Sequence, residues 1–566
     1  MKKILITLLF FVFTYNHSQG PLISNDYNEQ KKWVDSVYSS LTIDEKIGQL
    51  FTVWVATKYG SDEINHISNL IKEHHLGGLI FSLGNIKDQA KAINHFQKIS
   101  KVPLLISMDA EWGVGMRLDD AFSFPYNMTL GAIKNDSLVF EVGKRIGYHA
   151  KRLGVHINFA PVVDINTNPR NPIIGSRSFG EDKFNVSRKA INYLTGMHHY
   201  GIMGAAKHFP GHGDTETDSH LTLPSISFSK ERINNVELYP FRQLIDNNLD
   251  GVMTAHLNIP NLDKNEISTL SDKIINGLLI EDLGFEGLVI TDALDMKAIV
   301  DFSKGNYPDV SALNAGNDLL LMPTDIAKSI KEIKKGLQRK KISSMRLEKA
   351  VKKLLLAKYK SGVNNFKPIE IENIVEDMNQ DEDYALLDKL AEESITLVKN
   401  DINNLPFTSS NDESIGYIKF GDDSHDTFFK YLNNYKKVSH INKSNSDSLF
   451  EKSIAYDKII IGLHKTDDSP FADYKFSADE ISFIDKIKSK TNLTIVVFAK
   501  PYSMLDLDVR GIESILISYQ NSKVFQTKAA QALFGAINVK GVLPVSINKD
   551  IPVNTSIILK KKTFRF

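Results

Sequence analysis

Eight short apolar runs recur between residues 47 and 322, and amphipathic stretches separate them. The runs are rich in Val, Ile, Leu, Gly and Ala and do not alternate strictly between apolar and polar positions. Parallel strands covered on both faces have this composition, and the intervals are long enough for crossover helices. The runs occupy residues 47–54, 76–81, 103–108, 155–163, 201–207, 251–254, 287–291 and 319–322. The pattern predicts an α/β fold with an N-terminal (β/α)8 TIM-like barrel, and an open doubly wound sheet is the alternative.

A linker and a smaller unit follow the predicted barrel. Apolar positions among the Lys and Arg of residues 331–358 predict closing helices with a solvated charged face. Residues 360–383 have the Asn, Asp, Glu, Gly and Pro content of a linker. Beyond them, apolar runs alternate with helical segments at 478–487 and 524–534, which indicates an α/β sandwich. These later runs lie at 395–398, 415–420, 459–463, 493–498 and 515–517. We expect the barrel domain over residues 21–360, the linker over 361–385 and the C-terminal domain over 386–566.

The first twenty residues have the features of an export signal. Lys2 and Lys3 precede an apolar run over residues 4–13, and a polar stretch with small residues ends at Gly20. The run is shorter than the roughly 20 residues of a membrane helix, and no later stretch approaches that length. We therefore expect a signal peptide over residues 1–20, a mature chain that starts near Pro21, and a periplasmic or secreted protein without a stable membrane span. An uncleaved N-terminal anchor is the alternative.

Composition excludes several classes of protein. Among the 566 residues, Lys+Arg 68 balances Asp+Glu 68, so a nucleic-acid-binding polycation is not expected. Cys is absent, which excludes disulfide scaffolds, thiolate metal sites, cysteine nucleophiles and acylated lipoproteins. No glycine fingerprint for a dinucleotide or a P-loop phosphate occurs, and we expect no cofactor. Any catalysis falls to carboxylates, His, Ser/Thr, Tyr or Lys.

Ionisable residues close five of the eight apolar runs. In a barrel, catalytic groups stand at the carboxyl ends of the strands. The residues at these ends are Asp109, Asp164, His208, His256 and Asp292. Asp292 follows a hydrophobic run directly, and a carboxylate in that place suits nucleophilic attack on a glycosidic carbon. Asp295 lies about a helical turn further on and is expected to be a cap or surface residue.

The densest group of polar residues is the segment 207–220, KHFPGHGDTETDSH. A proline and two glycines argue against a helix through its first half and predict a shaped loop over the barrel mouth. If the end of the loop is extended, Asp218 and His220 project to one side, where the carboxylate stabilises the protonated imidazole. His212 and Asp214 are expected to hold the loop together. A divalent-metal site formed by His208, His212 and His220 with Asp214 or Asp218 is the alternative, although their spacing matches no recognised ligand motif.

Four segments carry a resemblance to a known family. Residues 207–220 resemble the signature loop of the β-N-acetylglucosaminidase branch of family 3 glycoside hydrolases. The segment 290–296, ITDALDM, resembles the nucleophile segment of that branch. Residues 109–117, DAEWGVGMR, and 172–180, PIIGSRSFG, resemble its two substrate segments. The similarity runs from about residue 41 to residue 359, and a weaker likeness reaches the second domain at 529–535 and 541–545.

The resemblance assigns a role to each of these positions. It implies that Asp292 is the nucleophile, that His220 is the acid/base and that Asp218 is the partner of His220. The non-reducing sugar is then held, through its hydroxyls and its N-acetyl group, by Asp109, Arg117, Arg177, Lys207 and His208. No metal is required. Ala110, Trp112 and Val114 stand where the branch commonly has Gln, Gly and Arg, so we expect a differently shaped rim near Asp109.

The function that the resemblance implies is an exo-acting, retaining β-N-acetylglucosaminidase. Cell-wall muropeptides are the implied carbohydrate substrate, with chitin fragments as the alternative. A β-glucosidase or a phosphorylase of the same family is the first rival reading. A glycan-binding protein without turnover is the second, and the intact catalytic positions argue against it. The sequence carries no signal for an oligomeric state.

Overall fold

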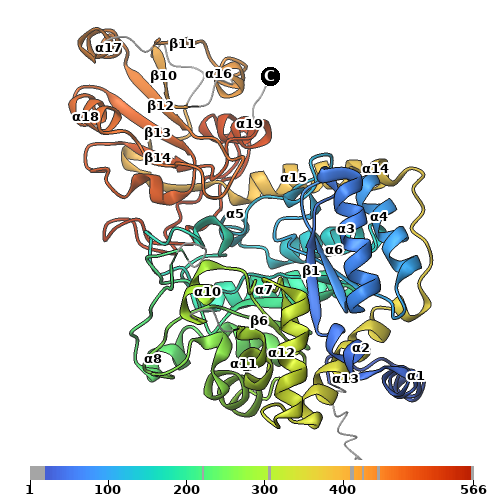
Figure 1. Ribbon diagram of the computed structural model, residues 1–566. Helices are drawn as coiled ribbons and strands as arrows, with labels where there is room; N and C mark the ends of the chain where they lie inside the picture. The colour runs from blue at the N-terminus through green and yellow to red at the C-terminus, as the bar shows by residue number, and fades with distance from the viewer. Residues whose placement is uncertain are drawn as a thin grey trace, which may run out of the picture.

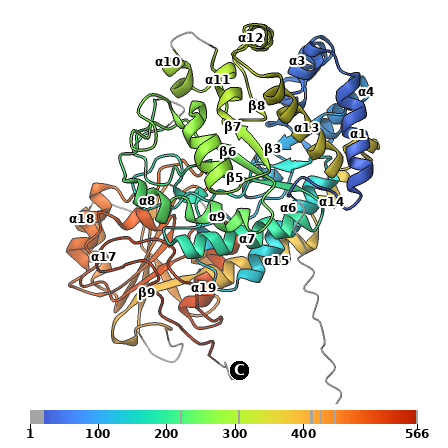
Figure 2. The ribbon, with the colours of Figure 1, turned by 90° about the horizontal axis from the view of Figure 1, so that it is seen from below.

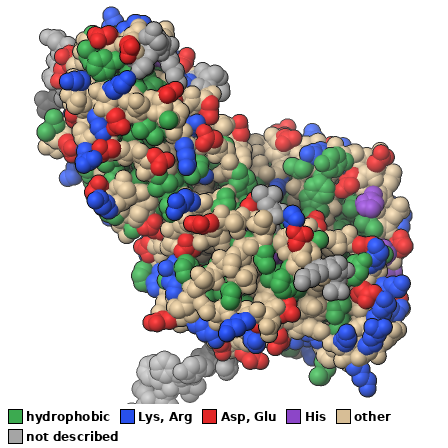
Figure 3. Space-filling model, turned by 60° about the vertical axis from the view of Figure 1, so that its left-hand side comes forward, with side chains coloured by type: hydrophobic (Ala, Val, Ile, Leu, Met, Phe, Trp, Pro, Cys, Tyr) green, Lys and Arg blue, Asp and Glu red, His purple; other side chains and the backbone are tan. Residues whose placement is uncertain are grey.

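The computed structural model describes residues 20–218, 222–303, 307–407, 413–422, 426–442 and 446–562. The predicted leader, apart from Gly20, lies outside these residues, and so does His220. The described chain forms two α/β lobes, an N-terminal barrel and a smaller C-terminal domain (Figure 1). No helix of this described part has the length and hydropathy that crossing a membrane requires. Acidic and basic side chains are mixed over the visible face of both lobes (Figure 3).

The barrel is an eight-stranded parallel sheet with the order β7-β6-β5-β4-β3-β2-β1-β8. A parallel bridge between Ile290 and Leu319 joins its two ends. The strands are β1 (Phe51–Val55), β2 (Gly78–Phe81), β3 (Leu105–Met108), β4 (Ile157–Asn158), β5 (Met203–Phe209), β6 (Gly251–Thr254), β7 (Leu288–Thr291) and β8 (Leu320–Leu321). Each strand falls on one of the eight predicted runs, although β1 extends one residue and β5 two residues beyond the run. The predicted barrel is confirmed, and the open sheet is excluded.

Helices surround the strands, as the view from below shows (Figure 2). The longer ones are α1 (Tyr27–Ser40), α3 (Gly60–His74), α4 (Ile86–Ile99), α6 (Asp136–Arg152), α7 (Lys183–His198), α11 (Pro308–Ala315), α12 (Ile326–Gln338) and α13 (Ser344–Lys360). The shorter ones are α2 (Ile43–Gly48), α5 (Asn127–Gly131), α8 (Lys230–Asn235), α9 (Tyr239–Ile245) and α10 (Lys297–Ser303), and a π-helix spans Lys273–Asp282. In α4, for example, the Asn85 side chain caps the first turn, and Ile86, Ala90 and Ile93 face the core at helical spacing.

The basic stretch before the linker forms α12 and α13, as predicted. Leu347, Val351 and Leu355 of α13 are buried on one face. Lys358 departs from the expected solvated face, because its side chain is fully buried and its Nζ donates to Gln49 Oε1 at 2.6 Å. Burial lowers the pKa of Lys358 to about 7. Charge patterning along a helix does not reveal that one lysine of the face turns inward.

The C-terminal domain is a six-stranded sheet between two helical layers, which confirms the predicted α/β sandwich. The sheet order is β11-β10-β12-β13-β14-β9, parallel except for β9 against β14. The strands are β9 (Thr396–Asn400), β10 (Ile415–Gly421), β11 (Val438–His440), β12 (Lys458–His464), β13 (Asn492–Phe498) and β14 (Ser514–Ile517). The helices are α16 (Thr427–Leu432), α17 (Ser446–Ser453), α18 (Ala478–Ile487) and α19 (Lys523–Leu533). Sequence analysis missed β11, an edge strand of three residues of which only the first is buried.

The carboxyl ends of β12, β13 and β14 face the barrel. The Asn166 amide donates to the Tyr502 hydroxyl at 2.7 Å, and the Tyr126 backbone N–H donates to Gln520 Oε1 at 2.9 Å. The Ser546 backbone N–H donates to Glu181 at 2.8 Å. Loops at these strand ends are the usual functional edge of a parallel sheet. The fold therefore brings the functional edges of both sheets toward each other.

The linker is bound to the barrel along its length through α14 (Ile374–Asp377) and α15 (Asp381–Ser394). The Asp383 carboxylate is fully buried, with Arg145 Nε at 2.7 Å and His149 Nε2 at 3.1 Å. Burial alone would raise the pKa of Asp383, but His149 and Arg145 outweigh it and hold the pKa below its usual value. The stabilisation is therefore present above about pH 4, the unfolded value, and is lost as the pH falls through the lowered folded value.

We expect Asp383→Ala to destabilise the folded protein by about 3 kcal/mol at pH 7, because it leaves the guanidinium of Arg145 without its buried partner. Glu382→Ala, an exposed change in the same helical turn, should stay within about 0.5 kcal/mol of the wild type. Chemical denaturation followed by circular dichroism measures both. The deficit of Asp383→Ala should shrink below pH 4, and equal stability of the two variants would contradict the anchoring role.

Candidate active site

A cavity of about 850 Å³ opens at the carboxyl ends of the barrel strands. Five of the eight strands contribute a residue to its lining, from Trp54 of β1 to Leu321 of β8, and Asp109 and Asp292 directly follow β3 and β7. The predicted site residues within the described chain all line it, namely Asp109, Arg117, Arg177, Lys207, His208, Asp218 and Asp292. His220 lies outside the described residues. The structure thus brings together side chains that are up to 183 positions apart, Asp109 and Asp292 (292 − 109 = 183).

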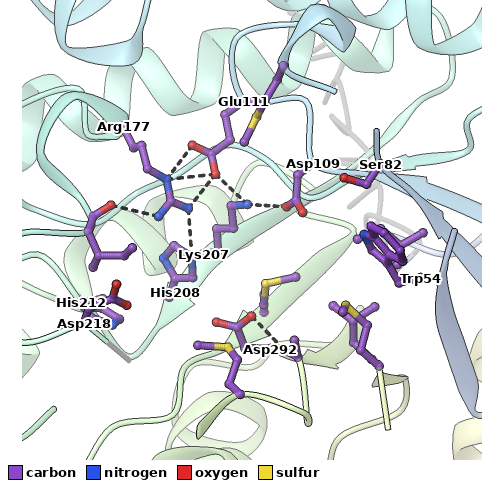
Figure 4. A pocket seen from close by; sticks show the side chains of 18 of the residues that line it. Trp54, Ser82, Asp109, Glu111, Arg177, Lys207, His208, His212, Asp218 and Asp292 are labelled. Carbon is purple, nitrogen blue, oxygen red and sulfur yellow. Dashed lines mark hydrogen bonds and ion pairs between the residues drawn. The ribbon is translucent and has the colours of Figure 1, made fainter. Parts of the chain in front are cut away.

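A row of alternating charges forms one wall of the cavity (Figure 4). We call Arg117, Asp109, Lys207, Glu111 and Arg177 the ion-pair row. Arg117 Nη2 lies 2.9 Å from Asp109 Oδ2, and Lys207 Nζ lies 2.7 Å from Asp109 Oδ1. The same Lys207 Nζ is 2.8 Å from Glu111 Oε1, which Arg177 Nη2 approaches to 2.7 Å. Each carboxylate therefore bridges two cations.

The neighbouring cations keep both carboxylates of the row ionised. Burial alone would raise the pKa of Glu111, but Arg177 and Lys207 outweigh it and hold the pKa well below its usual value. Burial opposes ionisation of Asp109 as well, and Lys207 and Arg117 lower its pKa. Ionised acceptors and charged donors are thus fixed before any ligand arrives. This preorganisation suits recognition of a ligand with several hydroxyl or amide groups.

Asp164, six residues beyond the end of β4, orients two histidines. Its Oδ2 lies 2.7 Å from His208 Nδ1, and its Oδ1 accepts from the backbone N–H of His212 at 2.7 Å. When the Nδ1–H group of His208 donates a hydrogen bond to Asp164, the Nε2 atom of the neutral ring is left as an acceptor. Arg177 Nη2 lies 3.4 Å from this Nε2 atom. Sequence analysis noted Asp164 as a strand end without giving it a role. Its role is to fix the tautomer of a cavity residue.

Asp292 stands at the end of β7 on the side of the cavity across from the ion-pair row (Figure 4). Its Oδ1 accepts from the backbone N–H of Ala293 at 2.8 Å, and its own N–H donates to the Thr254 carbonyl of β6 at 3.0 Å. His256 lies behind this turn rather than in the cavity lining. Its Nε2 is 2.9 Å from the Ala293 carbonyl oxygen and its Nδ1 is 2.7 Å from Thr269 Oγ1. The Ala293 N–H therefore positions the carboxylate, and Thr254 and His256 hold the backbone of the turn that carries it.

The signature loop begins later than its sequence suggests, because Lys207, His208 and Phe209 belong to β5. His212 is buried and lines the cavity, with Nδ1 2.8 Å from Thr215 Oγ1. Burial, followed by the proximity of His208, lowers the pKa of His212 to about 4, so the ring is neutral at pH 7. Asp214 lies 3.8 Å from Arg232 Nη2 and does not line the cavity. The described residues contain no group of three metal-ligating side chains, and the alternative metal site that includes His220 lies partly outside them.

Several cavity residues were missed by sequence analysis. Glu111 bridges Lys207 and Arg177, and sequence analysis gave it no role although it lies in the segment 109–117 that resembles a substrate segment. Trp54 and Ser82 come from the ends of β1 and β2, which carry no ionisable group. Asp295 is exposed, as expected, but it borders the cavity. Phe471 comes from the C-terminal domain, and nothing in its sequence neighbourhood indicates that it reaches the barrel.

A parallel barrel with acidic, basic and imidazole groups at its mouth has the architecture of a TIM-barrel enzyme. The pattern of the glycosyl hydrolase family 3 N-terminal domain matches residues 42–357. Because this match covers more than half of the chain, the protein belongs to glycosyl hydrolase family 3.

Named relatives agree with this membership. Beta-hexosaminidase A of Pseudoalteromonas piscicida is 36% identical over 285 residues, which are 46% of this chain and 48% of that protein. The chain thus spans about half the length of that relative. The beta-hexosaminidase of Haemophilus influenzae (strain PittEE) is 36% identical over 258 residues, 44% of this chain and 72% of that protein.

Solved structures cover both domains. A glycoside hydrolase family 3 beta-N-acetylglucosaminidase from Paenibacillus sp. FPU-7 has a TM-score of 0.76 at 29% identity, over 91% of this chain and 100% of that chain. A beta-glucoside phosphorylase has a TM-score of 0.79 at 22% identity, over 92% of this chain and 97% of that chain. This likeness shows a shared fold.

We expect Glu111→Gln to destabilise the protein by about 3 kcal/mol at pH 7, because two buried cations lose the charge that they share. Asp295→Asn, which removes an exposed charge at the rim of the same cavity, should change stability by less than about 0.5 kcal/mol. Chemical denaturation of the two variants beside the wild type measures the difference. If Glu111→Gln had the stability of the wild type, the ion-pair row would not need the Glu111 charge for its contribution to stability.

Proposed function

We propose that the protein is an exo-acting, retaining β-N-acetylglucosaminidase that releases terminal non-reducing N-acetylglucosamine. The observation that carries this proposal is the position of Asp292 across one cavity from the ion-pair row, with Asp218 on the same lining. A nucleophile opposite a fixed set of donors and acceptors is the arrangement that glycoside cleavage needs. Family membership and the names of the relatives support the same activity.

The first sugar binds against the ion-pair row in this proposal. The Asp109 carboxylate accepts from sugar hydroxyls, and Arg117, Lys207 and Arg177 donate to hydroxyl and acetamido oxygens. His208, with its tautomer fixed by Asp164, offers Nε2 to the same ring. Because the charged side chains are already paired with one another, they need to move little when the sugar binds.

The chemistry proceeds in two displacements. The Asp292 carboxylate attacks the anomeric carbon while the imidazolium of His220 gives its proton to the glycosidic oxygen, and the leaving group departs. Neutral His220 then takes a proton from water, whose oxygen attacks the same carbon and releases Asp292. Asp218 stabilises the imidazolium. A free imidazole has a pKa of about 6.5, so both protonation states are available near neutral pH.

Rival activities are separated by one comparison of substrates. A relative from Cellulomonas fimi, named beta-N-acetylglucosaminidase/beta-glucosidase, is 29% identical over 386 residues, 66% of this chain and 68% of that protein. Turnover of an aryl N-acetylglucosaminide and an aryl glucoside, each with and without phosphate, tests the proposal. Faster release from the N-acetylglucosaminide without phosphate is the expected result. A preference for glucoside, a sugar phosphate product, or binding without release would each overturn it.

The natural substrate and the location of the protein are also proposals. We propose cell-wall muropeptides as the substrate and chitin fragments as the alternative, and product analysis on both decides between them. The leader in the sequence supports export. N-terminal sequencing of the protein from the periplasm or the medium should then find a start near Pro21.

We expect Asp292→Ala to retain sugar binding and to lose turnover by several orders of magnitude, because the covalent path is closed. A 2-deoxy-2-fluoro or 5-fluoro sugar should label Asp292 in the wild type, and mass spectrometry of the digested protein locates the label. A label on another carboxylate, or a product of inverted configuration, would falsify the retaining scheme.

We expect His220→Ala to slow natural disaccharides more than activated aryl glycosides, because a good leaving group departs without a proton. Asp218→Ala should slow the same steps, and the double variant should be little worse than His220→Ala, since the two residues act as one unit. Rates on a series of leaving groups measure this dependence.

His212→Asn is the control, since a ring that is neutral at pH 7 is not expected to supply the proton. If His212→Asn showed the full leaving-group dependence and His220→Ala showed none, the acid/base role would belong to His212.

A further inference from the structure

We infer that a second cavity, at the amino ends of the barrel strands, binds a small organic anion, namely a planar ring that carries a carboxylate or a phosphate. We call it the floor cavity. Its volume is about 540 Å³, and within the described chain it shares no lining residue with the catalytic cavity. Cavities of this size hold small ligands. The inference goes beyond the proposed function and does not depend on it.

The segments that surround the floor cavity place it at the bottom of the barrel. Residues 154–156 lead directly into β4, and Tyr200 lies between α7 and β5. The last turns of α6 and residues of the segment 361–369, which follows α13, form the other walls. Because β4 and β5 begin here, the floor cavity lies at the opposite end of the barrel from Asp292.

The lining of the floor cavity is positively charged. Among the described residues it contains no carboxylate, whereas Lys151, Arg152, His156 and Lys367 all contribute to it. The Arg152 guanidinium is neutralised by Asp377, with 2.8 Å between Nε and Oδ2. Neither lysine forms an ion pair with a carboxylate in the part of the chain that the structure describes. The cavity therefore offers two cations to a ligand of the opposite charge.

His156 supplies a fixed hydrogen-bond donor to the same cavity. It is 8% exposed, and its Nδ1 accepts from the Ile106 backbone N–H at 2.9 Å. Burial, followed by the positive charges of Lys151 and Lys358, lowers the pKa of His156 to about 3, so the ring is neutral at pH 7. A neutral ring whose Nδ1 accepts carries its proton on Nε2. The Nε2–H group is thus the donor that His156 can offer to an anion.

A buried ammonium group near His156 lacks a counter-ion. Lys358 is fully buried, its Nζ donates to Gln49 Oε1 at 2.6 Å, and no carboxylate of the described residues pairs with it. Its charge is close enough to His156 to lower the pKa of that ring. Buried charges are usually paired, because an isolated charge in a protein interior is costly. An anion against His156 would supply negative charge to both Lys358 and Lys151.

Three aromatic side chains form the apolar walls of the floor cavity. Tyr148, Tyr200 and Phe366 line it, and all three are partly buried. Tyr148 and Tyr200 pack edge-on, with their ring centroids 5.6 Å apart, and the Arg145 guanidinium lies 4.6 Å from the centre of the Tyr148 ring. Aromatic rings held in this way favour edge or offset contacts with a further planar ring. A ring that carries an acidic group fits both the walls and the charged floor.

The first test measures binding by isothermal titration calorimetry. The probes are benzoate and phenyl phosphate, and benzamide is a neutral control with the shape of benzoate. We expect at least one of the two anions to bind with a dissociation constant of about 1 mM or tighter, and benzamide to bind about tenfold more weakly than benzoate or not at all. No binding of either anion, or equal binding of benzoate and benzamide, would overturn the inference.

Matched variants locate the bound anion. Lys151→Gln, an exposed change, should weaken the affinity for the anion by about fivefold. Lys349→Gln makes the same charge change at an exposed position of α13 outside the lining, and should alter the affinity by less than about twofold. Equal losses in the two variants, or no loss in Lys151→Gln, would reject the floor cavity as the site.

Two further variants test the donor and the aromatic wall. His156→Asn keeps an oxygen that can accept from the Ile106 N–H but removes Nε2–H, and should weaken the anion by about tenfold. Phe366→Ala should weaken both benzoate and phenyl phosphate by about fivefold, because the ring loses one wall. Unchanged affinity in both variants would contradict the proposed arrangement.

Enzyme kinetics separate the floor cavity from the catalytic cavity. Saturating benzoate should change kcat and KM for an aryl N-acetylglucosaminide by less than about twofold, because the two cavities lie at opposite ends of the barrel. Competitive inhibition that persists in Lys151→Gln would place the anion at the ion-pair row and overturn the inference. If the protein had no hydrolase activity, the proposed function would fail, while the calorimetric comparison of the variants would still decide about the floor cavity.

Discussion

The pairing of buried charges in the ion-pair row is the constraint on which the rest of the site depends. An unpaired charge at this depth would cost several kcal/mol, and each member of the row is tolerated because its neighbours carry the opposite charge. Lys207 shows this dependence on neighbouring charges best, because its ammonium group forms ion pairs with both Asp109 and Glu111. The barrel must therefore hold the ends of β3 and β5 and the loop of Arg177 in one arrangement. A stiff parallel barrel provides that arrangement.

The two domains contribute to the cavity in different ways. The barrel supplies charged and titratable groups from its strand ends and from the loops that follow them. The C-terminal domain supplies one apolar ring, Phe471, on a loop that Tyr126 of the barrel and Lys500 of the same domain hold in place. The carboxyl edges of both sheets face each other, so one cavity can receive residues from both.

The pattern of apolar positions predicted a helix or strand correctly wherever the buried residues recur at the spacing of that element. All eight barrel strands fall on predicted runs, since a strand covered on both faces must be apolar throughout. The helix α18 matches its predicted bounds, because Ser477 caps it and its buried positions recur at helical spacing. β11 was missed because an edge strand with one buried residue has no such pattern. The inward turn of Lys358 was missed because its partner, Gln49, lies 309 positions earlier in the chain.

The sequence by itself determined which chemical groups reach the barrel mouth, because the carboxyl ends of parallel strands meet at one end and the residues after each run must lie there. Asp109, His208 and Asp292 were placed in this way, and all three line the cavity. Only the tertiary structure decided which groups touch. Glu111 bridges two cations, His256 turns behind Asp292 instead of into the cavity, and Phe471 crosses from the other domain. Such contacts join residues far apart in the chain, and the packing of whole elements sets them, which no local periodicity encodes.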